Sequence, residues 1–399
     1  MIPRALAVVY SRYFQGGGKI FNYIIVGAGL AGSVMAERIA SQLGEKVLVV
    51  ERRNHIGGNC YDERDDNGIL VHRYGPHILH TDSEEVFEYL SAFTGWREYQ
   101  HRVLGSIDGT RVPLPFNLDS LRMLFPPSLA ERLEEKMIEE YGFGSRVPIM
   151  ELMGCGDPDI EFLADYVYRK VFLNYTMKQW GLEPGDIDPG VTARVPIVLS
   201  RDDRYFNDRY QALPVDGYTA MIGRMLDHPC IKLMLNTSHD EVLELRDGRI
   251  HFMGSEFRGK LIFTGKIDEL FGYRYGELPY RSLDLRFESL DMEWFQEAAT
   301  VNYPNDYDFT RITEFKHLHP ADSRRTTLLR EYPCRHVEGE NEPFYPVFTD
   351  ETRAKYEGYL ELAREFEDLI LVGRLAEYRY YDMDDIVLRA LRVFEEMID

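Results

Sequence analysis

The strongest restriction on the fold of this chain is a glycine-rich turn, Gly-Ala-Gly-Leu-Ala-Gly, at residues 27–32. Residues 21–26 before it are apolar and β-branched, which predicts a buried strand. Residues 33–43 after it have helical periodicity and end at a glycine, and residues 46–50 predict a second buried strand followed by Glu51. The order of strand, glycine turn, helix, strand and acid predicts a nucleotide-binding βαβ unit.

Each glycine of this turn has a physical task in a dinucleotide site. Gly27 permits the tight turn, Gly29 lets a pyrophosphate approach the backbone, and Gly32 lets the helix pack against the strand. The free N–H groups at the start of the helix would bind phosphate. Glu51 is placed to accept ribose hydroxyls, which favours a nucleotide site over a tight turn without a ligand.

Two further features favour FAD over NAD. The Gly57-Gly58 turn after the acid resembles the extended adenine-dinucleotide signature of FAD enzymes. Residues 369–372 predict a last buried strand, followed by Gly373 and a closing helix over 384–397. In such folds the last helix points its N-terminus at the flavin pyrimidine, where its dipole stabilises negative charge on the reduced ring.

Charge and composition exclude several classes of function. The 399 residues suggest two or three domains, and the formal net charge of −21 argues against general nucleic-acid binding. An anionic ligand therefore requires cations that are concentrated locally. No apolar run reaches the roughly 18–20 residues needed to span a bilayer. The four scattered cysteines have no metal-ligand spacing, and they favour a reducing compartment.

The remaining chain predicts a mixed α/β protein. We expect residues 1–20 to be a loose extension and residues 116–180 to be mostly helical, with a helix that starts at the Pro126-Pro127 pair. Residues 190–215 predict a loop or irregular strands, and residues 231–235 predict a strand. Residues 248–263 alternate like a hairpin, and residues 278–345 are aromatic and rich in predicted strand.

Seven segments, in order, resemble the UDP-galactopyranose mutase family and together extend over nearly the whole chain from residue 21. They are RNHIGGN at 53–59, YGPHILHT at 74–81, NYTMKQW at 174–180, DRYFNDRYQ at 203–211 with Pro214 and Gly217-Tyr218-Thr219, YRSL at 280–283, TRI at 310–312 and GRLAEYRYYDM at 373–383.

The resemblance implies an α/β fold with three parts. These are an FAD-binding Rossmann-type domain (21–100, 215–270 and 366–399), an inserted α-helical domain (115–180) and an antiparallel β-sheet domain (101–114, 190–214 and 271–365) with a mobile loop at 185–215. It implies an isomerase of UDP-galactopyranose and UDP-galactofuranose in which N5 of reduced FAD attacks the anomeric carbon, with no net redox change. It also implies a cytoplasmic protein, and a homodimer as in many bacterial members.

The family grips the substrate diphosphate with two arginines, because a guanidinium fork binds phosphate oxygens in two places. Arg194 matches the arginine on the mobile loop, and Arg311 matches the fixed one. His80 is expected near the sugar or the isoalloxazine. The family usually has Pro-Val-Arg after the mobile arginine, but this chain has Pro-Ile-Val at 196–198, so a second arginine is lost.

Other side chains are matched to substrate and cofactor by the same resemblance. Tyr205 and Phe206 would stack on uracil, and Asp382 would either orient the arginines or cap the last helix. The full substrate set is His101, Tyr175, Thr176, Trp180, Tyr205, Phe206, Arg281, Asn302, Tyr345, Tyr380 and Asp382. The FAD set is Gly27, Gly29, Leu30, Ala31, Gly32, Glu51, Arg52, Gly58, Asn59, His77, Ile78, Asn236, Thr237, Arg374 and Met383. We predict no metal, because His77 and His80 lack a third ligand.

Two other functions share this type of nucleotide domain. An amine-oxidase-like oxidoreductase would turn over with oxidised flavin and consume oxygen. A Rab-escort-like binding protein would retain no FAD. The arginines and the Lys-Gln-Trp sequence at 178–180 favour the mutase over both.

Overall fold

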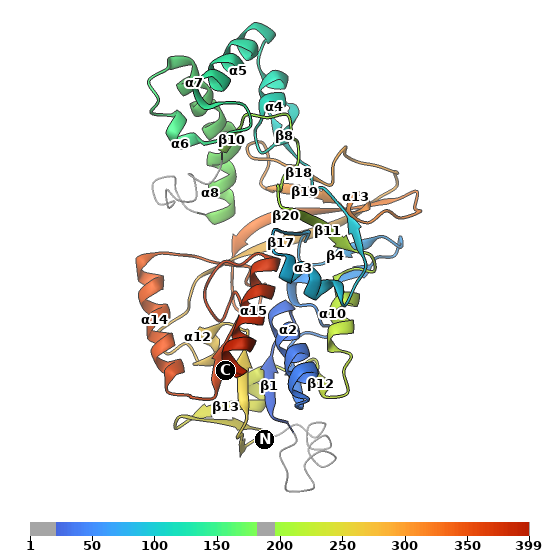
Figure 1. The fold of residues 1–399 in the computed structure, drawn as a ribbon, viewed down its shortest axis with the longest axis vertical. Helices are drawn as coiled ribbons and strands as arrows, with labels where there is room; N and C mark the ends of the chain where they lie inside the picture. The colour runs from blue at the N-terminus through green and yellow to red at the C-terminus, as the bar shows by residue number, and fades with distance from the viewer. Residues whose placement is uncertain (1–20, 182–195, 399) are drawn as a thin grey trace.

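The computed structural model describes residues 21–181 and 196–398, and it has three parts arranged along one long axis (Figure 1). A parallel sheet and its helices form the lower part, a larger sheet lies in the middle, and a group of helices lies at the top. The predicted extension at 1–20 lies outside the described residues. The predicted mobile loop is described only from residue 196 onward.

The lower part is built on a five-stranded sheet in which all neighbouring strands are parallel. The first strand lies in the centre, as in the 3-2-1-4-5 order of a dinucleotide-binding fold. Across the sheet the strands are β12 (Ile231–Met234), β2 (Val47–Val50), β1 (Tyr23–Val26), β16 (Lys260–Phe263) and β22 (Leu369–Leu371). This confirms the predicted Rossmann-type unit.

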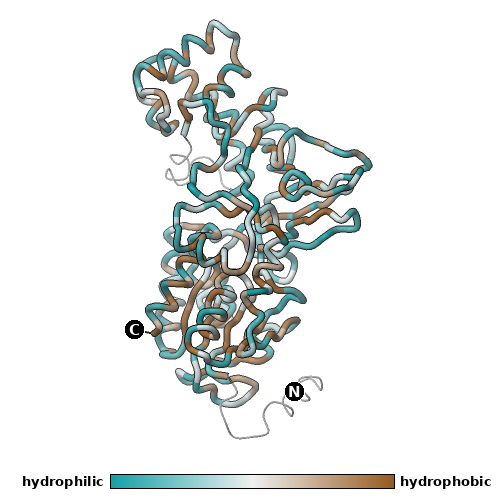
Figure 2. Tube along the Cα trace, turned by 45° about the vertical axis from the view of Figure 1, so that its right-hand side comes forward, coloured by the Kyte–Doolittle hydropathy of each residue, from teal (hydrophilic) through white to brown (hydrophobic). Residues whose placement is uncertain are grey.

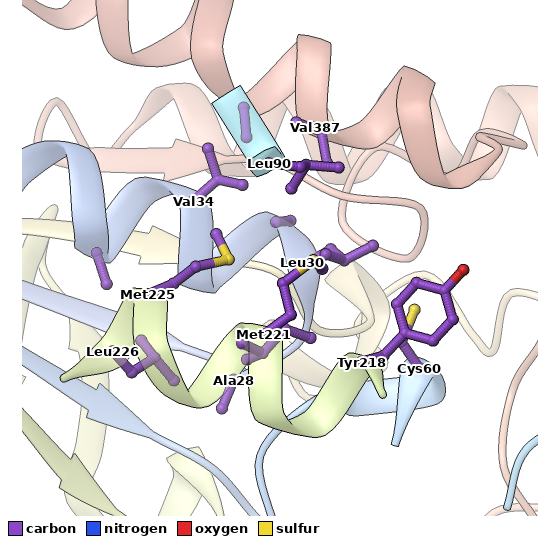
Figure 3. Packing of buried hydrophobic residues seen from close by; sticks show 14 of the residues in the cluster. Ala28, Leu30, Val34, Cys60, Leu90, Tyr218, Met221, Met225, Leu226 and Val387 are labelled. Carbon is purple, nitrogen blue, oxygen red and sulfur yellow. The ribbon is translucent and has the colours of Figure 1, made fainter. Parts of the chain in front are cut away.

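Alternate residues of these strands bury two opposite faces. Ile25 and Val49 face a core with three helices, α2 (Leu30–Arg38), α10 (Tyr218–Leu226) and α15 (Met383–Ile398). Side chains of these helices meet around Val34, as Figure 3 shows. Ile24 and Leu48 face the other core, which includes residues of a small antiparallel sheet, β13 (Leu243–Arg246), β14 (Arg249–Phe252) and β15 (Ser255–Glu256).

The predicted hairpin at 248–263 is wrong in its second half. β14 and β15 do form a hairpin, but residues 260–263 form β16, which pairs in parallel with β1 at the centre of the large sheet. Alternating hydrophobicity cannot distinguish these strands, because partner and direction are set by distant residues. The first helix ends as predicted at Gly44 (φ +66°), and its last turn is a π-helix, η1 (Ile39–Leu43).

The middle part is a seven-stranded sheet, predicted to be antiparallel. Its strands in order are β21 (Tyr345–Pro346), β17 (Tyr280–Leu290), β20 (Thr326–Arg335), β19 (Arg311–Glu314), β18 (Thr300–Asn302), β7 (Val103–Ile107) and β8 (Thr110–Leu114). All neighbours are antiparallel except β18 and β7, which run in parallel. The sheet is therefore mixed at one pair.

The upper part confirms the predicted helical stretch and has its own core. It contains α4 (Leu118–Leu124), α5 (Pro127–Tyr141), α6 (Ile149–Leu152), α7 (Pro158–Val167), the π-helix η3 (Tyr168–Leu173) and α8 (Asn174–Trp180). Leu121, Leu133 and Leu163 are among its buried residues. Strand β10 (Pro196–Val198), which follows the undescribed segment, pairs with β9 (Arg146–Pro148) of this part.

The remaining helices and strands lie outside the two large sheets and the upper group of helices. They are η2 (Gly58–Cys60), β3 (Asp62–Arg64), β4 (Leu70–His72), β5 (Leu79–Thr81), α3 (Glu84–Ser91), β6 (Trp96–Glu98), β11 (Tyr210–Pro214), α11 (His239–Val242), α12 (Ile267–Leu270), α13 (Phe315–Leu318) and α14 (Asp350–Arg364). Hydrophobic stretches run through the strands of the lower part (Figure 2). In the described part of the chain, no helix has the length and apolar character needed to cross a membrane.

Candidate functional site

Two cavities meet between the lower part and the middle sheet. The first lies along the glycine turn and the segments that follow the parallel strands. The second lies against the middle sheet and is lined by Arg311, Asn302 and His101. Six residues line both cavities, namely Asn59, His77, Phe344, Arg374, Asp382 and Met383. A ligand bound in the first cavity can therefore present one end to the second.

Glycines allow close backbone packing beside the first cavity. Gly27 has φ +102°, and a Cβ atom there would lie 2.1 Å from Oγ1 of Thr264. A Cβ on Gly32 would lie 2.0 Å from the Gly27 carbonyl oxygen, and one on Gly58 would lie 2.8 Å from Cα of Gly29. The glycines therefore let the two turns and α2 pack closely, as in the glycine turn of a dinucleotide site. Gly29, Leu30 and Ala31 at the start of α2 line the first cavity, where free N–H groups can bind a pyrophosphate. The residues present therefore fit FAD.

Glu51 supports the glycine turn as well as lining the first cavity. It is buried, and its carboxylate accepts hydrogen bonds from the backbone N–H groups of Ala28 and Arg53, each at 2.8 Å. Asn236 is placed by local backbone geometry, because its φ is +53° and its N–H donates to the Arg53 carbonyl. The predicted contact of Glu51 with a ribose stays a prediction.

Most residues of the predicted FAD set line the first cavity, and three do not. Gly32 packs against the turn, Asn236 lines neither cavity, and Ile78 lines the second cavity. The sequence interpretation missed Lys266 and Glu269, which also line the first cavity. They follow β16, and the mistaken hairpin concealed that this strand ends at the nucleotide site.

A polar row crosses three strands of the middle sheet under the second cavity. Strand register places Asn302 opposite Arg311, and Arg311 opposite Glu331. An Arg311 Nη2–H group donates to the Tyr175 hydroxyl at 2.6 Å, and Nε lies 3.6 Å from Oε2 of Glu331. Asn302 Oδ1, Arg311 Nε and Glu331 Oε1 are buried without a hydrogen-bond partner among the described residues. Such unsatisfied groups are typical of a site for a polar ligand.

The second cavity is lined by two arginines, Arg311 and Arg374, and by two acidic residues, Glu331 and Asp382. Burial lowers the pKa of Arg311, but Tyr175 and Glu331 act against it and hold the pKa well above its ordinary value. The Arg374 guanidinium lies over the rings of Tyr345 and Tyr380, at 5.5 and 5.1 Å from their centroids. Two arginines with two tyrosine hydroxyls nearby can bind a diphosphate.

Two histidines and two aromatic rings form one wall of this cavity. His80 stacks on Phe206 with ring centroids 3.7 Å apart, and its Nδ1 lies 3.3 Å from Oδ2 of Asp208. One face of Phe206 is thus covered, and Tyr205, which is 37% exposed, is the more accessible platform for a base. Burial, with Arg311 and His80, lowers the pKa of His101 to about 3. His101 is therefore a neutral hydrogen-bonding group.

Several predicted substrate residues lie elsewhere. The Arg281 guanidinium lines neither cavity and donates to backbone carbonyls of α8. Thr176 is buried on α8 away from the lining, and Tyr175 reaches the site through Arg311. Arg194 and the Trp180 side chain lie outside the described residues. The substrate roles of all these residues stay predictions.

The sequence interpretation also missed residues of the second cavity. Glu331, Thr300 and Phe344 line it. Glu331 and Thr300 face the cavity because of cross-strand register, and a single strand sequence carries no sign of its partner. The nearest available signal for Phe344 was its position next to the predicted Tyr345.

Comparison with known proteins supports this geometry. The family described as UDP-galactopyranose mutase matches residues 170–380, and an NAD(P)-binding Rossmann-like domain matches residues 25–93. The chain is 36% identical to a probable UDP-galactopyranose mutase of Klebsiella pneumoniae, over 94% of each chain. It is 34% identical to a dTDP-fucopyranose mutase of Escherichia coli, over 92% of this chain and 96% of that one. The crystal structure of a reduced UDP-galactopyranose mutase matches with a TM-score of 0.71 and 17% identity, over 95% of this chain and 94% of that one.

Proposed function

The chain belongs to the UDP-galactopyranose mutase family, and on this premise we propose that it interconverts UDP-galactopyranose and UDP-galactofuranose without net redox change. The observation that carries the proposal is the meeting of a glycine-lined cavity with an arginine-lined one at six shared residues. When bound and reduced, FAD supplies the N5 nucleophile for the anomeric carbon. An isomerase of this type needs its cofactor ring and its anion site side by side.

The chain's own residues hold and orient the reactants. The start of α2 binds the cofactor pyrophosphate through free N–H groups. Helix α15 begins at Met383, which lines both cavities, so the positive end of its dipole favours negative charge at the junction. Arg311 and Arg374 bind the substrate diphosphate and stabilise the charge on departing UDP.

The lost family arginine does not remove this anion site. Val198 is buried in β10, and its partner in the strand pair is Arg146 of β9. The diphosphate contacts proposed above use Arg311 and Arg374, which lie on other elements. Arg194 is proposed as a further ligand from the resemblance alone.

Location, assembly and sugar range complete the proposal. The four free cysteines support a cytoplasmic location, and the family resemblance supports a homodimer. The relatives named for UDP-galactopyranose and for dTDP-fucopyranose are similarly distant from this chain. We favour the UDP sugar because the matching family carries that description.

The decisive experiment is an anaerobic assay with dithionite-reduced protein and UDP-galactofuranose. UDP-galactopyranose should form, and oxidised protein should form none. Absence of product under reducing conditions would contradict the proposal, and product from only a dTDP-fucofuranose substrate would correct the sugar. Oxygen consumption by the oxidised protein would favour the amine-oxidase alternative, and a colourless protein without FAD would favour the binding-protein alternative.

Arg311→Ala tests the anion site. Removal of one charge-stabilising donor often costs about 10²–10³-fold in rate, so kcat should fall by at least two orders of magnitude. The matched control is Arg330→Ala. Arg330 is next to Glu331 in the sequence, but its guanidinium forms an ion pair with Glu288. The control should keep near-normal kcat, and a loss below about fivefold in Arg311→Ala would show that Arg311 does not carry the diphosphate charge.

A further inference from the structure

We propose that Arg281 is a positioning residue that fixes helix α8 on the middle sheet and thereby holds the Tyr175 hydroxyl against Arg311. This inference rests on the proposed function, because its catalytic effect passes through the diphosphate site. It assigns a role to an arginine that lines neither cavity. Its structural part can be measured without any substrate.

The Arg281 guanidinium is occupied by the end of α8. From strand β17, its Nε–H donates to the Gln179 carbonyl at 2.9 Å, and an Nη2–H donates to the Lys178 carbonyl at 3.1 Å. The last carbonyls of a helix have no partner within the helix, and a cation there also interacts favourably with the negative end of the helix dipole. A planar guanidinium can satisfy two such carbonyls at once, which an ammonium group does less well.

Gly181 is shaped to receive this guanidinium. It ends α8 in the left-handed conformation, with φ +64°, and its N–H donates to the Met177 carbonyl at 2.7 Å. A Cβ atom at this position would lie 2.6 Å from Nη1 and 3.0 Å from Cζ of Arg281. The glycine therefore serves both the helix end and the close approach of Arg281.

A second cation joins the same helical turn to the middle part, and this cation belongs to the helix itself. Lys178, on α8, donates its Nζ–H groups to the carbonyls of Tyr303 and Tyr307, at 3.2 and 2.5 Å, in the loop after β18. Among the described residues, no carboxylate forms an ion pair with Arg281 or with Lys178. Both cations instead join α8 to the middle part through backbone carbonyls.

The fixed helix carries Tyr175 to the anion site. The Tyr175 hydroxyl accepts a hydrogen bond from Arg311 Nη2 at 2.6 Å, and Arg311 lies on β19 of the middle sheet. If the end of α8 loosens, this hydroxyl loses its position and Arg311 loses one of its orienting partners. Arg311 keeps its charge and its place on β19, so it can still stabilise the charge on departing UDP, and the loss should fall on diphosphate binding in the ground state and the transition state alike. KM should therefore rise more than kcat falls.

Hydrogen exchange in the FAD-loaded protein without substrate tests the structural step. In Arg281→Ala, amides of residues 175–181 should exchange at least tenfold faster than in the wild type. Arg281→Lys should recover only part of the protection. The matched control is Arg286→Ala, because Arg286 lies on the same strand but pairs with Asp284 at the surface, and its exchange should equal that of the wild type.

UDP affinity by calorimetry and steady-state kinetics test the functional step. Arg281→Ala should raise the UDP Kd and KM about tenfold while kcat changes by less than about threefold. The double variant Arg281→Ala/Tyr175→Phe should bind UDP no more weakly than the worse single variant, because both changes remove one coupled contact. FAD content should stay equal in all variants.

Several results would overturn the inference. These are unchanged exchange in residues 175–181, additive losses in the double variant, or a fall in kcat with unchanged UDP affinity. If Arg281→Ala does not fold, Gly181→Ala displaces the guanidinium without deleting it and should produce the same exchange pattern. If wild-type protein does not bind UDP, the proposed function fails, and hydrogen exchange alone then decides whether Arg281 fixes α8.

Discussion

Gly29 and Gly58 belong to two turns that are separated in the sequence but touch beside the first cavity. Gly58 has φ +55°, and its missing side chain leaves the space that Gly29 occupies. The contact holds the turn after Glu51 against the glycine turn. At the scale of single residues, the cofactor site therefore depends on a glycine, because a side chain at Gly58 would disturb the contact between the two turns.

Gly58→Ala should weaken FAD binding. The new Cβ would lie 2.8 Å from Cα of Gly29, so the glycine turn must shift. The left-handed conformation adds a strain of about 1–2 kcal/mol for an L-residue. We expect the FAD Kd, measured by flavin fluorescence, to rise at least tenfold.

Gly68→Ala is the matched control for this substitution. Gly68 has φ +75°, so it imposes a similar backbone strain, but nothing lies within 4 Å of its added Cβ. This variant should lose some stability and keep its FAD affinity. Equal FAD loss in both variants would assign the effect to general strain and not to the contact between the turns.

At the scale of elements, the segment 336–343 between β20 and β21 joins the middle sheet to the cofactor cavity. Its Glu342 forms ion pairs with Arg52 and with Arg53, the latter at 2.6 Å, and its Glu338 pairs with Lys266. Burial raises the pKa of Glu342, but Arg53 and Arg52 outweigh this and hold it below its ordinary value. The segment therefore acts as an ionised clamp beside the first cavity.

Glu342→Gln should speed FAD release. The substitution keeps the size of the side chain but removes the charge that binds both arginines. We expect the FAD dissociation rate, measured by dilution and recovery of flavin fluorescence, to rise about tenfold at low salt. The difference from the wild type should shrink at high salt, because salt screens partly exposed ion pairs.

Glu340→Gln provides the control within the same segment. Glu340 is exposed, and no ion pair links it to another described residue. Its FAD dissociation rate should match that of the wild type. Faster release from this variant, or unchanged release from Glu342→Gln, would show that the segment does not retain FAD through these ion pairs.

At the scale of the whole molecule, buried neutral histidines link folding to pH. Burial lowers the pKa of His101 to about 3, and burial with Arg97 and Arg64 lowers the pKa of His319 to about 4. In the unfolded chain a histidine takes up a proton near pH 6.5. Below that pH the unfolded state binds more protons than the folded state, so stability falls as the pH falls.

His101→Asn should reduce this pH dependence. Between pH 7 and pH 5, one such histidine contributes a loss of about 2 kcal/mol in the free energy of unfolding. Urea denaturation at the two pH values should therefore show a drop that is about 2 kcal/mol smaller in His101→Asn than in the wild type. An equal drop in both proteins would mean that His101 titrates alike in the folded and unfolded states.

Local patterns in the sequence were sufficient for the nucleotide unit, the helical stretch and the family. Strand and helix periodicity and the glycine turn depend on neighbouring residues, so they can be read from short segments. Short ordered motifs also selected Arg311 and most of the FAD set, which line the two cavities, while their roles stay predictions. The strand at 260–263 shows the limit, since one of its two parallel partners is β1, more than two hundred residues away.

Tertiary structure alone decided which side chains meet. Register across β19 and β20 placed Glu331 beside Arg311, and the packing of α8 on the middle sheet brought its last carbonyls to Arg281, which lines neither cavity. These contacts join residues that are distant in the chain, and their geometry depends on how whole elements pack. A motif can thus indicate that an arginine matters, while only the packed fold determines whether it binds a phosphate or the end of a helix.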